Sequence, residues 1–202
     1  MIRVKICGVT TVEDAQLAAE LGASAIGLVL WPGSPRFVEP KQAKAIVAAL
    51  PAFVSAVGVF VDQADAAMAI AREVGLSAVQ FHGNEPAGSY RTLPIRVIKA
   101  VTVRDASARE EAAAVPAGAT VLLDAHDRVK RGGTGRVVDW SIAAMIARER
   151  PVILSGGLNA GNVAEAVRTV APYAIDVSSG VELAFGRKDP AKLRALFAAL
   201  DL

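Results

Sequence analysis

The sequence contains one cysteine, two histidines and no long uninterrupted hydrophobic run. A single cysteine excludes an internal disulfide, which fits a cytoplasmic protein. His82 and His126 are far apart and form no HxH or HExxH pattern, so we expect no metal centre. The longest apolar stretch, 46–61, is broken by Pro51 and is too short to span a bilayer comfortably. Since no secretory hydrophobic segment is present either, we expect neither membrane insertion nor export.

The sequence also lacks an excess of one charge. Its 22 lysines and arginines nearly balance 20 aspartates and glutamates, and the basic residues are scattered rather than clustered. Nucleic-acid binders concentrate basic residues on one face, so we expect no nucleic-acid partner. A chain of 202 residues can bury about 70% of the surface that its unfolded form exposes. No linker or low-complexity segment interrupts it, and we expect one catalytic domain over residues 1–202.

Eight short runs rich in valine, isoleucine and leucine recur along the chain. Most are continuously apolar rather than alternating, which is typical of strands buried on both faces of a parallel sheet. Stretches with helical spacing of apolar residues separate most of them, and the pattern of β then α is compatible with an open sheet or a closed barrel. Eight units favour a compact (β/α)8 TIM barrel. The runs are 4–7, 25–30, 55–61, 78–81, 96–101, 120–125, 152–155 and 174–179.

Local signals at several helix boundaries support this alternation. Thr10 or Thr11 is placed to cap the first helix, and Pro40 suits the first turn of another. Gly22 and Gly75 are suited to end helices. The segment 85–94 permits only a short or irregular helix, whereas the residues after 189 predict a last helix.

In a (β/α)8 barrel the active site lies at the carboxyl ends of the strands. Several of the predicted strands end in polar residues: Cys7 ends the first run, His82 directly follows the fourth, Asp124 lies near the end of the sixth, and Asp176 begins the polar end of the eighth. We therefore expect these side chains to meet at one rim of the barrel. His82 is interpreted as a hydrogen-bonding residue at a strand end rather than as a metal ligand.

Cys7 and Asp124 each have two interpretations. A free cysteine is often only a small buried apolar residue, but at a barrel mouth nearby cations can favour the thiolate that acts as base or nucleophile. Asp124 directly follows an apolar run, where desolvation would keep the carboxyl protonated as a general acid. The alternative for Asp124 is a helix cap or an ordinary salt-bridge partner.

Glycine-rich segments follow the seventh and eighth runs. Glycines in SGGLNAGNV and DVSSGVE would let backbone N–H groups approach an anion closely. The loops after the seventh and eighth strands are the usual phosphate site in barrels of this kind. RGGTG, after the sixth run, would add a third wall; the alternative is that these glycines only serve tight turns. The candidate phosphate-binding residues are Gly133, Gly156, Gly157, Ser179 and Gly180.

Arg36, in the segment WPGSPRFV after the second run, is a candidate for binding a substrate carboxylate with two parallel hydrogen bonds. The alternative is an ordinary surface arginine. Trp31 and Phe37 flank the same segment and would either wall an aromatic pocket or serve packing alone.

Taken in order, the motifs KICGVT, SPRFV, GVFVD, VQFHGNE, LLDA, GGTGRVVDW, LSGGLNAGNV and DVSSGVE resemble those of the phosphoribosylanthranilate isomerase family of tryptophan biosynthesis. The resemblance covers nearly the whole chain and implies a (β/α)8 barrel without cofactor or metal. It implies a small phosphorylated substrate, while a monomer and a homodimer both stay open. Phe81 replaces a common aliphatic residue, and the segment after Asp124 is unusually basic.

The resemblance implies an Amadori rearrangement of N-(5-phospho-β-D-ribosyl)anthranilate. Asp124 would protonate the furanose ring oxygen, and the Cys7 thiolate, after a modest lowering of its pKa, would remove the proton from C2′. Arg36 would bind the anthranilate carboxylate. Asp176 would contact a ribose hydroxyl, while Gly156, Gly157, Ser179 and Gly180 would hold the phosphate.

Three alternatives compete with this interpretation. A dual-substrate isomerase that also acts in histidine biosynthesis would have two catalytic aspartates, one of them at the position of Cys7. The cysteine at this position therefore argues against such an enzyme. Indole-glycerol-phosphate synthase relies on lysine and glutamate groups; Lys5 and Lys99 lie on predicted strands, so the fold alone does not exclude it. A non-catalytic binder of a phosphorylated metabolite would not need both Cys7 and Asp124.

Overall fold

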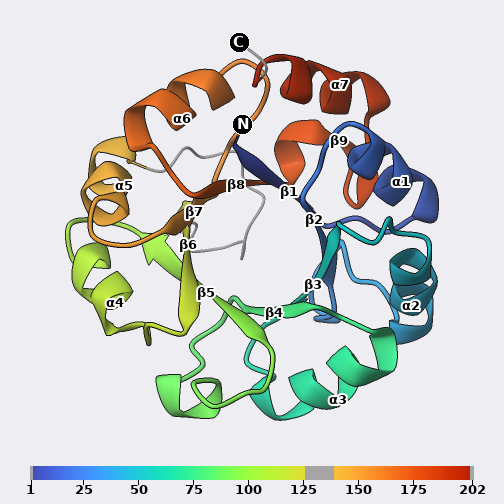
Figure 1. Ribbon diagram of the computed structural model, residues 1–202, viewed down its shortest axis with the longest axis horizontal. Coiled ribbons are helices and arrows are strands. Elements are labelled where there is room, and N and C mark those ends of the chain that lie inside the picture. The colour runs from blue at the N-terminus through green and yellow to red at the C-terminus, as the bar shows by residue number, and fades with distance from the viewer. Residues whose placement is uncertain (1, 126–138, 201–202) are drawn as a thin grey trace.

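The computed structural model describes residues 2–125 and 139–200. Eight parallel strands pair in chain order, and the last also pairs with the first, so the sheet is closed. Figure 1 shows this ring of strands with the helices arranged around its outside. The predicted (β/α)8 barrel is therefore confirmed. Its strands are β1 (Arg3–Cys7), β2 (Ala25–Val29), β3 (Ser55–Phe60), β4 (Ala78–Phe81), β5 (Arg96–Val103), β6 (Ala119–Ala125), β7 (Val152–Leu154) and β8 (Ala174–Val177).

Helices connect most successive strands on the outside of the barrel. Between β4 and β5 the connection contains only the short 3-10 helix η1 (Ala87–Ser89), in agreement with the irregular segment predicted at 85–94. The α-helices of the described residues are α1 (Val12–Glu20), α2 (Pro40–Ala48), α3 (Ala64–Val74), α4 (Ala108–Ala114), α5 (Trp140–Ala147), α6 (Val163–Val170) and α7 (Pro190–Ala198).

The predicted boundary residues act as expected. Thr11 caps α1 by accepting a hydrogen bond from the backbone N–H of Asp14 at 3.2 Å. Pro40 opens α2, where its missing N–H costs nothing. Gly75 ends α3 with φ of +83°, a left-handed conformation that suits glycine.

The strands are buried on both faces, which explains their continuously apolar sequences. The larger core cluster lies between the barrel and its helices and includes Val4 and Ile6 of β1. Because successive strand residues point to opposite faces, Lys5 and Cys7 project into the barrel instead. A smaller cluster fills the barrel and consists of Val57, Ala78, Ile98, Leu122, Ile153 and Ala174.

One element is absent from the sequence prediction. After β8 and the short 3-10 helix η2 (Ser179–Val181), the strands β9 (Glu182–Ala184) and β10 (Arg187–Lys188) pair as an antiparallel hairpin. Gly186, with φ of +76°, lies at its turn. The strands have only three and two residues, too few to produce a periodic sequence signal. The prediction also extended the eighth strand to residue 179, whereas β8 ends at Val177.

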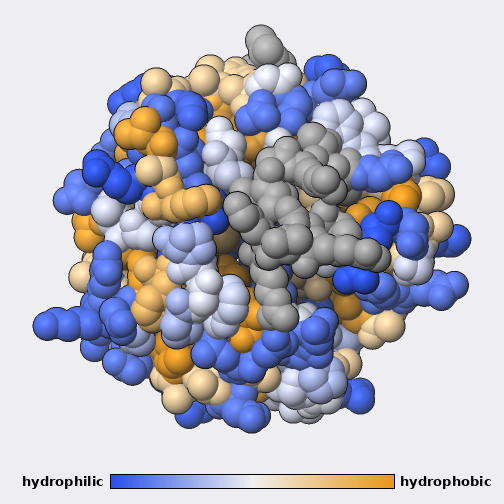
Figure 2. Space-filling view, turned by 180° about the vertical axis from the view of Figure 1, so that it is seen from behind, coloured by the Kyte–Doolittle hydropathy of each residue, from blue (hydrophilic) through white to orange (hydrophobic). Residues whose placement is uncertain are grey.

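The face shown in Figure 2 has hydrophilic residues around its periphery, with hydrophobic residues interspersed in small groups. Within residues 2–125 and 139–200, no helix has both the length and the hydrophobicity that crossing a bilayer requires.

Candidate active site

A pocket opens at the carboxyl ends of the strands and brings together four polar residues that the sequence placed there. Cys7, His82, Asp124 and Asp176, which come from four different strand ends, all line it. The pocket encloses about 730 Å³ when its open mouth is included. The predicted convergence of these side chains on one rim is therefore present.

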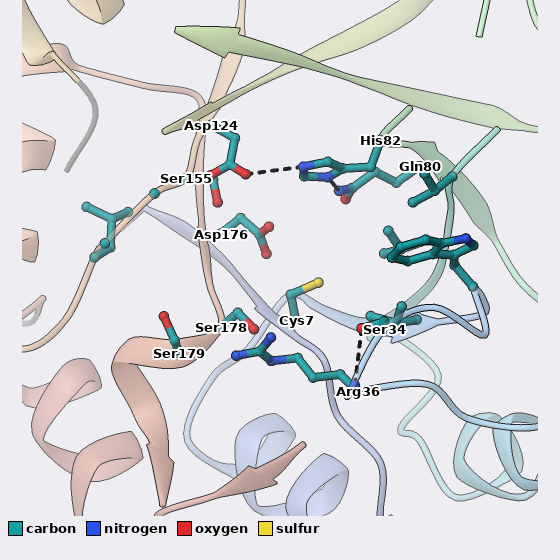
Figure 3. Close-up of a pocket in the computed structure, with 17 residues that line it drawn as sticks. Cys7, Ser34, Arg36, Gln80, His82, Asp124, Ser155, Asp176, Ser178 and Ser179 are labelled. Carbon is teal, nitrogen blue, oxygen red and sulfur yellow. Dashed lines mark hydrogen bonds and ion pairs between the residues drawn. The ribbon is translucent and has the colours of Figure 1, made fainter. Parts of the chain in front are cut away.

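Cys7 and Asp124 face the same space. Figure 3 shows the sulfur of Cys7 and the carboxylate of Asp124 directed into the pocket, with Asp176 between them in this view. Cys7 is only 8% exposed and packs with Val29 and Val59, and all three residues line the pocket. The arrangement gives one bound molecule access to both a thiol and a carboxyl group.

Lys5 and Asp176 form an ion pair inside the barrel, next to Cys7. Lys5 Nζ donates to Asp176 Oδ1 at 2.8 Å, and both side chains are buried. Burial would lower the pKa of Lys5, but the charges of Asp176 and Cys7 raise it above its ordinary value. Gly27 leaves the room for this contact, since a Cβ there would lie 2.7 Å from Cys7 Sγ and 3.0 Å from Lys5 Cε.

The pKa of Cys7 is raised, chiefly by burial. The positive charge of Lys5 opposes this rise, while the nearby negative charge of Asp176 adds to it, and Lys188 opposes it more weakly. The sequence-based expectation of a lowered thiol pKa is therefore wrong. The expected cations are present, but desolvation of the thiolate outweighs them.

His82 links Asp124 to Gln80. His82 Nε2 lies 3.2 Å from Asp124 Oδ2, and Gln80 Nε2 lies 3.0 Å from His82 Nδ1. With the amide nitrogen of Gln80 donating to Nδ1, the ring proton of His82 lies on Nε2 and faces Asp124. The backbone N–H of Ala125 donates to Asp124 Oδ1 at 2.9 Å. Both carboxyl oxygens of Asp124 are thus oriented, and His82 is the hydrogen-bonding strand-end residue that was predicted.

Arg36 lies in the loop after β2 and is 6% exposed, so its interpretation as an ordinary surface arginine is wrong. Its guanidinium donates two parallel hydrogen bonds to Glu182, at 2.8 Å from Nε and 2.7 Å from Nη2. Arg36 also lines the pocket, as does Trp31, whereas Phe37 is not among the lining residues. A bidentate partner for Arg36 therefore exists inside the chain.

The glycine-rich loops after β7 and β8 form one side of the pocket. Ser155, Gly156 and Gly157 line it after β7, and Ser179 lines it after β8. Gly156 and Gly157 have φ of +87° and +67°, conformations that glycine adopts without strain. Their backbones reach the pocket without side chains in the way, as an anion site requires.

Gly180 does not line the pocket but lies where the loops after β7 and β8 approach each other closely. A Cβ at Gly180 would lie 1.9 Å from the carbonyl oxygen of Leu158. Its direct contact with phosphate stays a prediction. Gly133, predicted to bind phosphate, lies outside the described residues, as do His126 and the basic positions Lys130 and Arg131.

The sequence interpretation assigned no site role to four buried residues around the pocket: Lys5, Gln80, Glu182 and Lys188. A signal for two of them exists. Lys5 and Gln80 are polar interruptions of apolar strands, two positions before Cys7 and His82, and residues two apart in a strand share a face. No group of three potential metal ligands occurs among the residues that the structure describes.

A closed parallel barrel with glycine loops after β7 and β8 and polar strand ends around one pocket has the architecture of the (β/α)8-barrel enzymes that act on phosphorylated substrates. The family model described as N-(5'phosphoribosyl)anthranilate (PRA) isomerase matches residues 4–199. The N-(5'-phosphoribosyl)anthranilate isomerase of Pelobacter propionicus is 47% identical over 195 residues, covering 96% of this chain and 93% of its own length. This chain belongs to the phosphoribosylanthranilate isomerase family.

Solved structures agree with this assignment. Phosphoribosyl anthranilate isomerase from Thermotoga maritima superposes with a TM-score of 0.93 at 40% identity, over 100% of both chains. A second structure, with a TM-score of 0.90 at 40% identity over 100% of both chains, holds reduced 1-(o-carboxyphenylamino)-1-deoxyribulose 5-phosphate. A third, from Thermotoga maritima, consists of monomers generated from a dimeric isomerase; it is 37% identical, with a TM-score of 0.89 over 100% of this chain and 99% of its own.

Proposed function

We propose that this chain converts N-(5-phospho-β-D-ribosyl)anthranilate into 1-(2-carboxyphenylamino)-1-deoxy-D-ribulose 5-phosphate, an isomerisation of tryptophan biosynthesis. Family membership supports the reaction, and the observation that carries it is the placement of Cys7 and Asp124 on one pocket. We further propose that residues 1–202 act as one catalytic domain in the cytoplasm. The family match over residues 4–199 supports the single domain.

The reaction needs one acid and one base. Asp124 donates a proton to the furanose ring oxygen while the C1′–O bond breaks, and the nitrogen lone pair forms a Schiff base with C1′. The Cys7 thiolate then removes the proton from C2′, and the electrons of that bond give an enolamine that tautomerises to the ketone. His82 orients the carboxyl group of Asp124 through the bond to Oδ2. The raised pKa of Cys7 makes its thiolate a strong base, and Lys5 stabilises that charged form.

The remaining residues suit the two anionic ends of this substrate. Arg36 would bind the anthranilate carboxylate from the loop after β2. Gly156, Gly157 and Ser179 would hold the phosphate through the loops after β7 and β8, with Gly180 bracing them. Asp176 would contact a ribose hydroxyl with the carboxylate oxygen that Lys5 leaves available. No catalytic step here requires a metal or an organic cofactor.

The three alternative functions are less well supported. Lys5 and Lys99, the lysines that raised the possibility of an indole-glycerol-phosphate synthase, are paired with Asp176 and Glu85 at 2.8 and 2.9 Å. A dual-substrate isomerase would carry an aspartate where this chain has Cys7. A non-catalytic binder would have no need of Cys7 and Asp124 on one pocket. Monomeric and homodimeric states both stay compatible with the proposal.

A direct assay tests the proposal. The purified protein is given phosphoribosylanthranilate and, separately, the aminoaldose of histidine biosynthesis, and loss of each substrate is followed spectroscopically. We expect turnover of the first at a rate far above that of the second. Binding without turnover would identify a phosphometabolite-binding barrel, and comparable rates on both substrates would identify a dual-substrate isomerase.

A further inference from the structure

Glu182 is the last residue of the motif DVSSGVE, and the proposed reaction leaves it without a task. It begins the β9–β10 hairpin, is 7% exposed and is not among the residues that line the pocket. Its carboxylate accepts both hydrogen bonds from the Nε and Nη2 edge of Arg36. Burial would raise the pKa of Glu182, but hydrogen bonds from Arg36 and the charge of Lys188 lower it, so the carboxylate is ionised at neutral pH.

Lys188, on the other strand of the hairpin, joins this pair to the backbone of Cys7. Its ammonium donates to Glu182 Oε1 at 3.0 Å, to the carbonyl oxygen of Cys7 at 2.6 Å and to that of Ser178 at 3.3 Å. These contacts use all three of its hydrogens. Lys188 is 4% exposed, so Arg36, Glu182 and Lys188 form a buried cluster of two cations and one carboxylate.

The cluster fixes which part of Arg36 remains for a ligand. A guanidinium presents five N–H groups, and Glu182 takes one from Nε and one from Nη2. The hydrogens of Nη1 and the second hydrogen of Nη2 form the other edge, which is the right shape for a second carboxylate. Figure 3 shows the guanidinium end of Arg36 drawn beside Cys7 and Ser178, all of which line the pocket.

Two further contacts hold the guanidinium in place. The ring of Phe185, at the hairpin turn, stacks on it with 4.9 Å between Cζ and the ring centre. The stem of Arg36 runs past Gly8, whose φ is +69° and where a Cβ would lie 2.5 Å from Arg36 Cδ. The backbone N–H of Lys188 donates to Asp14 in the first helix, and Thr10, just before that helix, donates to the carbonyl oxygen of Gly186, so the hairpin is also tied to this part of the chain.

We infer that Glu182 and Lys188 are positioning residues, which aim Arg36 at the carboxylate of an aromatic amine substrate. The cluster carries one excess positive charge at the pocket wall, which a substrate carboxylate would neutralise. This inference rests on the proposed function and adds to it the device that selects a carboxylated substrate. Because Glu182 acts through Arg36, its removal should impair substrate binding more than the chemical step.

The test compares two substrates, phosphoribosylanthranilate and its analogue phosphoribosylaniline, which lacks the carboxylate. We expect E182Q to raise KM for the carboxylated substrate by roughly 10- to 100-fold, with kcat much less affected and with kinetics on the aniline analogue unchanged. E165Q, at an exposed position on α6, is the matched control and should behave as wild type. In an R36M background, E182Q should add almost nothing to KM.

The double variant E182Q/K188M covers the case in which E182Q folds poorly. It removes one carboxylate and one cation, so the net charge of the cluster stays the same. The pair of hydrogen bonds from Arg36 to the carboxylate of Glu182 is lost. We expect the same selective rise in KM. If the wild type is active and E182Q changes KM equally for both substrates, or for neither, the inference is overturned while the proposed function stands. A wild type inactive on phosphoribosylanthranilate would overturn the proposed function and the inference together.

Discussion

Lys5 Nζ and Asp176 Oδ1 lie 2.8 Å apart inside the barrel, on neighbouring strands whose register pairs these two residues directly. Cys7 is two residues beyond Lys5 on the same inward face of β1. The thiol therefore has a cation and a carboxylate close to it, and their charges act on its pKa in opposite directions. This balance governs the pH at which Cys7 becomes a base.

Replacing Lys5 should shift the pH dependence of activity. The thiolate is the active form, so kcat rises as pH passes the raised pKa of Cys7. K5M removes the charge that lowers this pKa, so the rising limb should move to higher pH. The pH profile of kcat and the pH dependence of thiol alkylation both measure the shift.

K5M also leaves Asp176 buried without its partner, at a cost of about 3–5 kcal/mol. The double variant K5M/D176N removes both charges and should recover much of this stability. Since Asp176 raises the pKa of Cys7, the rising limb of the double variant should lie below that of K5M. An identical rising limb in wild type and both variants would mean that Lys5 does not act on the base.

Replacing Cys7 with alanine should remove the catalytic base. We expect turnover to fall by roughly 10²- to 10⁴-fold or more, because proton removal at C2′ has no other group to perform it. Binding of the reduced product analogue, measured by calorimetry, should persist, since Arg36 and the phosphate loops remain. Turnover like that of wild type would remove Cys7 from the mechanism.

Replacing Asp124 with asparagine should remove the acid while keeping the shape of the side chain. The amide oxygen can still accept from His82, so the pocket should persist, but no proton is available for the ring oxygen. We expect kcat to fall by roughly 10²- to 10⁴-fold. H82N is the informative comparison: it should reduce kcat less, since His82 only orients Asp124. Near-normal rates in D124N would require another acid.

Gly180→Ala should loosen the phosphate loops. Its Cβ would meet the carbonyl oxygen of Leu158 at 1.9 Å, so the loops after β7 and β8 must separate. We expect a loss of about 1–3 kcal/mol in unfolding free energy and a higher KM for the phosphorylated substrate. Gly118→Ala is the control, because nothing lies within 4 Å of a Cβ there. Equal melting temperatures and KM values in the two variants would show that close packing at Gly180 is unimportant.

Much of the fold could be predicted because each strand is buried on both faces. Continuous apolar runs follow from that burial, and all eight predicted strands are present within two residues at either end. The hairpin of β9 and β10 was missed because strands of three and two residues leave no periodic pattern, and Glu182 and Lys188 were missed with it.

The candidate site, like the fold, could be predicted only in part. Cys7, His82, Asp124 and Asp176 could be placed at one rim because parallel strands share a direction, so their carboxyl ends meet. The partner of Arg36 could not be predicted, since Glu182 is 146 residues away in sequence and begins β9, a strand too short to be predicted. The raised pKa of Cys7 was missed because desolvation depends on packing from all sides.

The barrel, the rim on which the polar residues lie and the family could all be predicted from the sequence, because the apolar runs, the polar residues at their ends and the motifs each occupy a short stretch of the chain. The charge environment of Cys7 and the orientation of Arg36 could not be predicted in this way. Both depend on contacts between residues more than 140 positions apart, Lys5 with Asp176 and Arg36 with Glu182, which closure of the barrel brings within 3 Å.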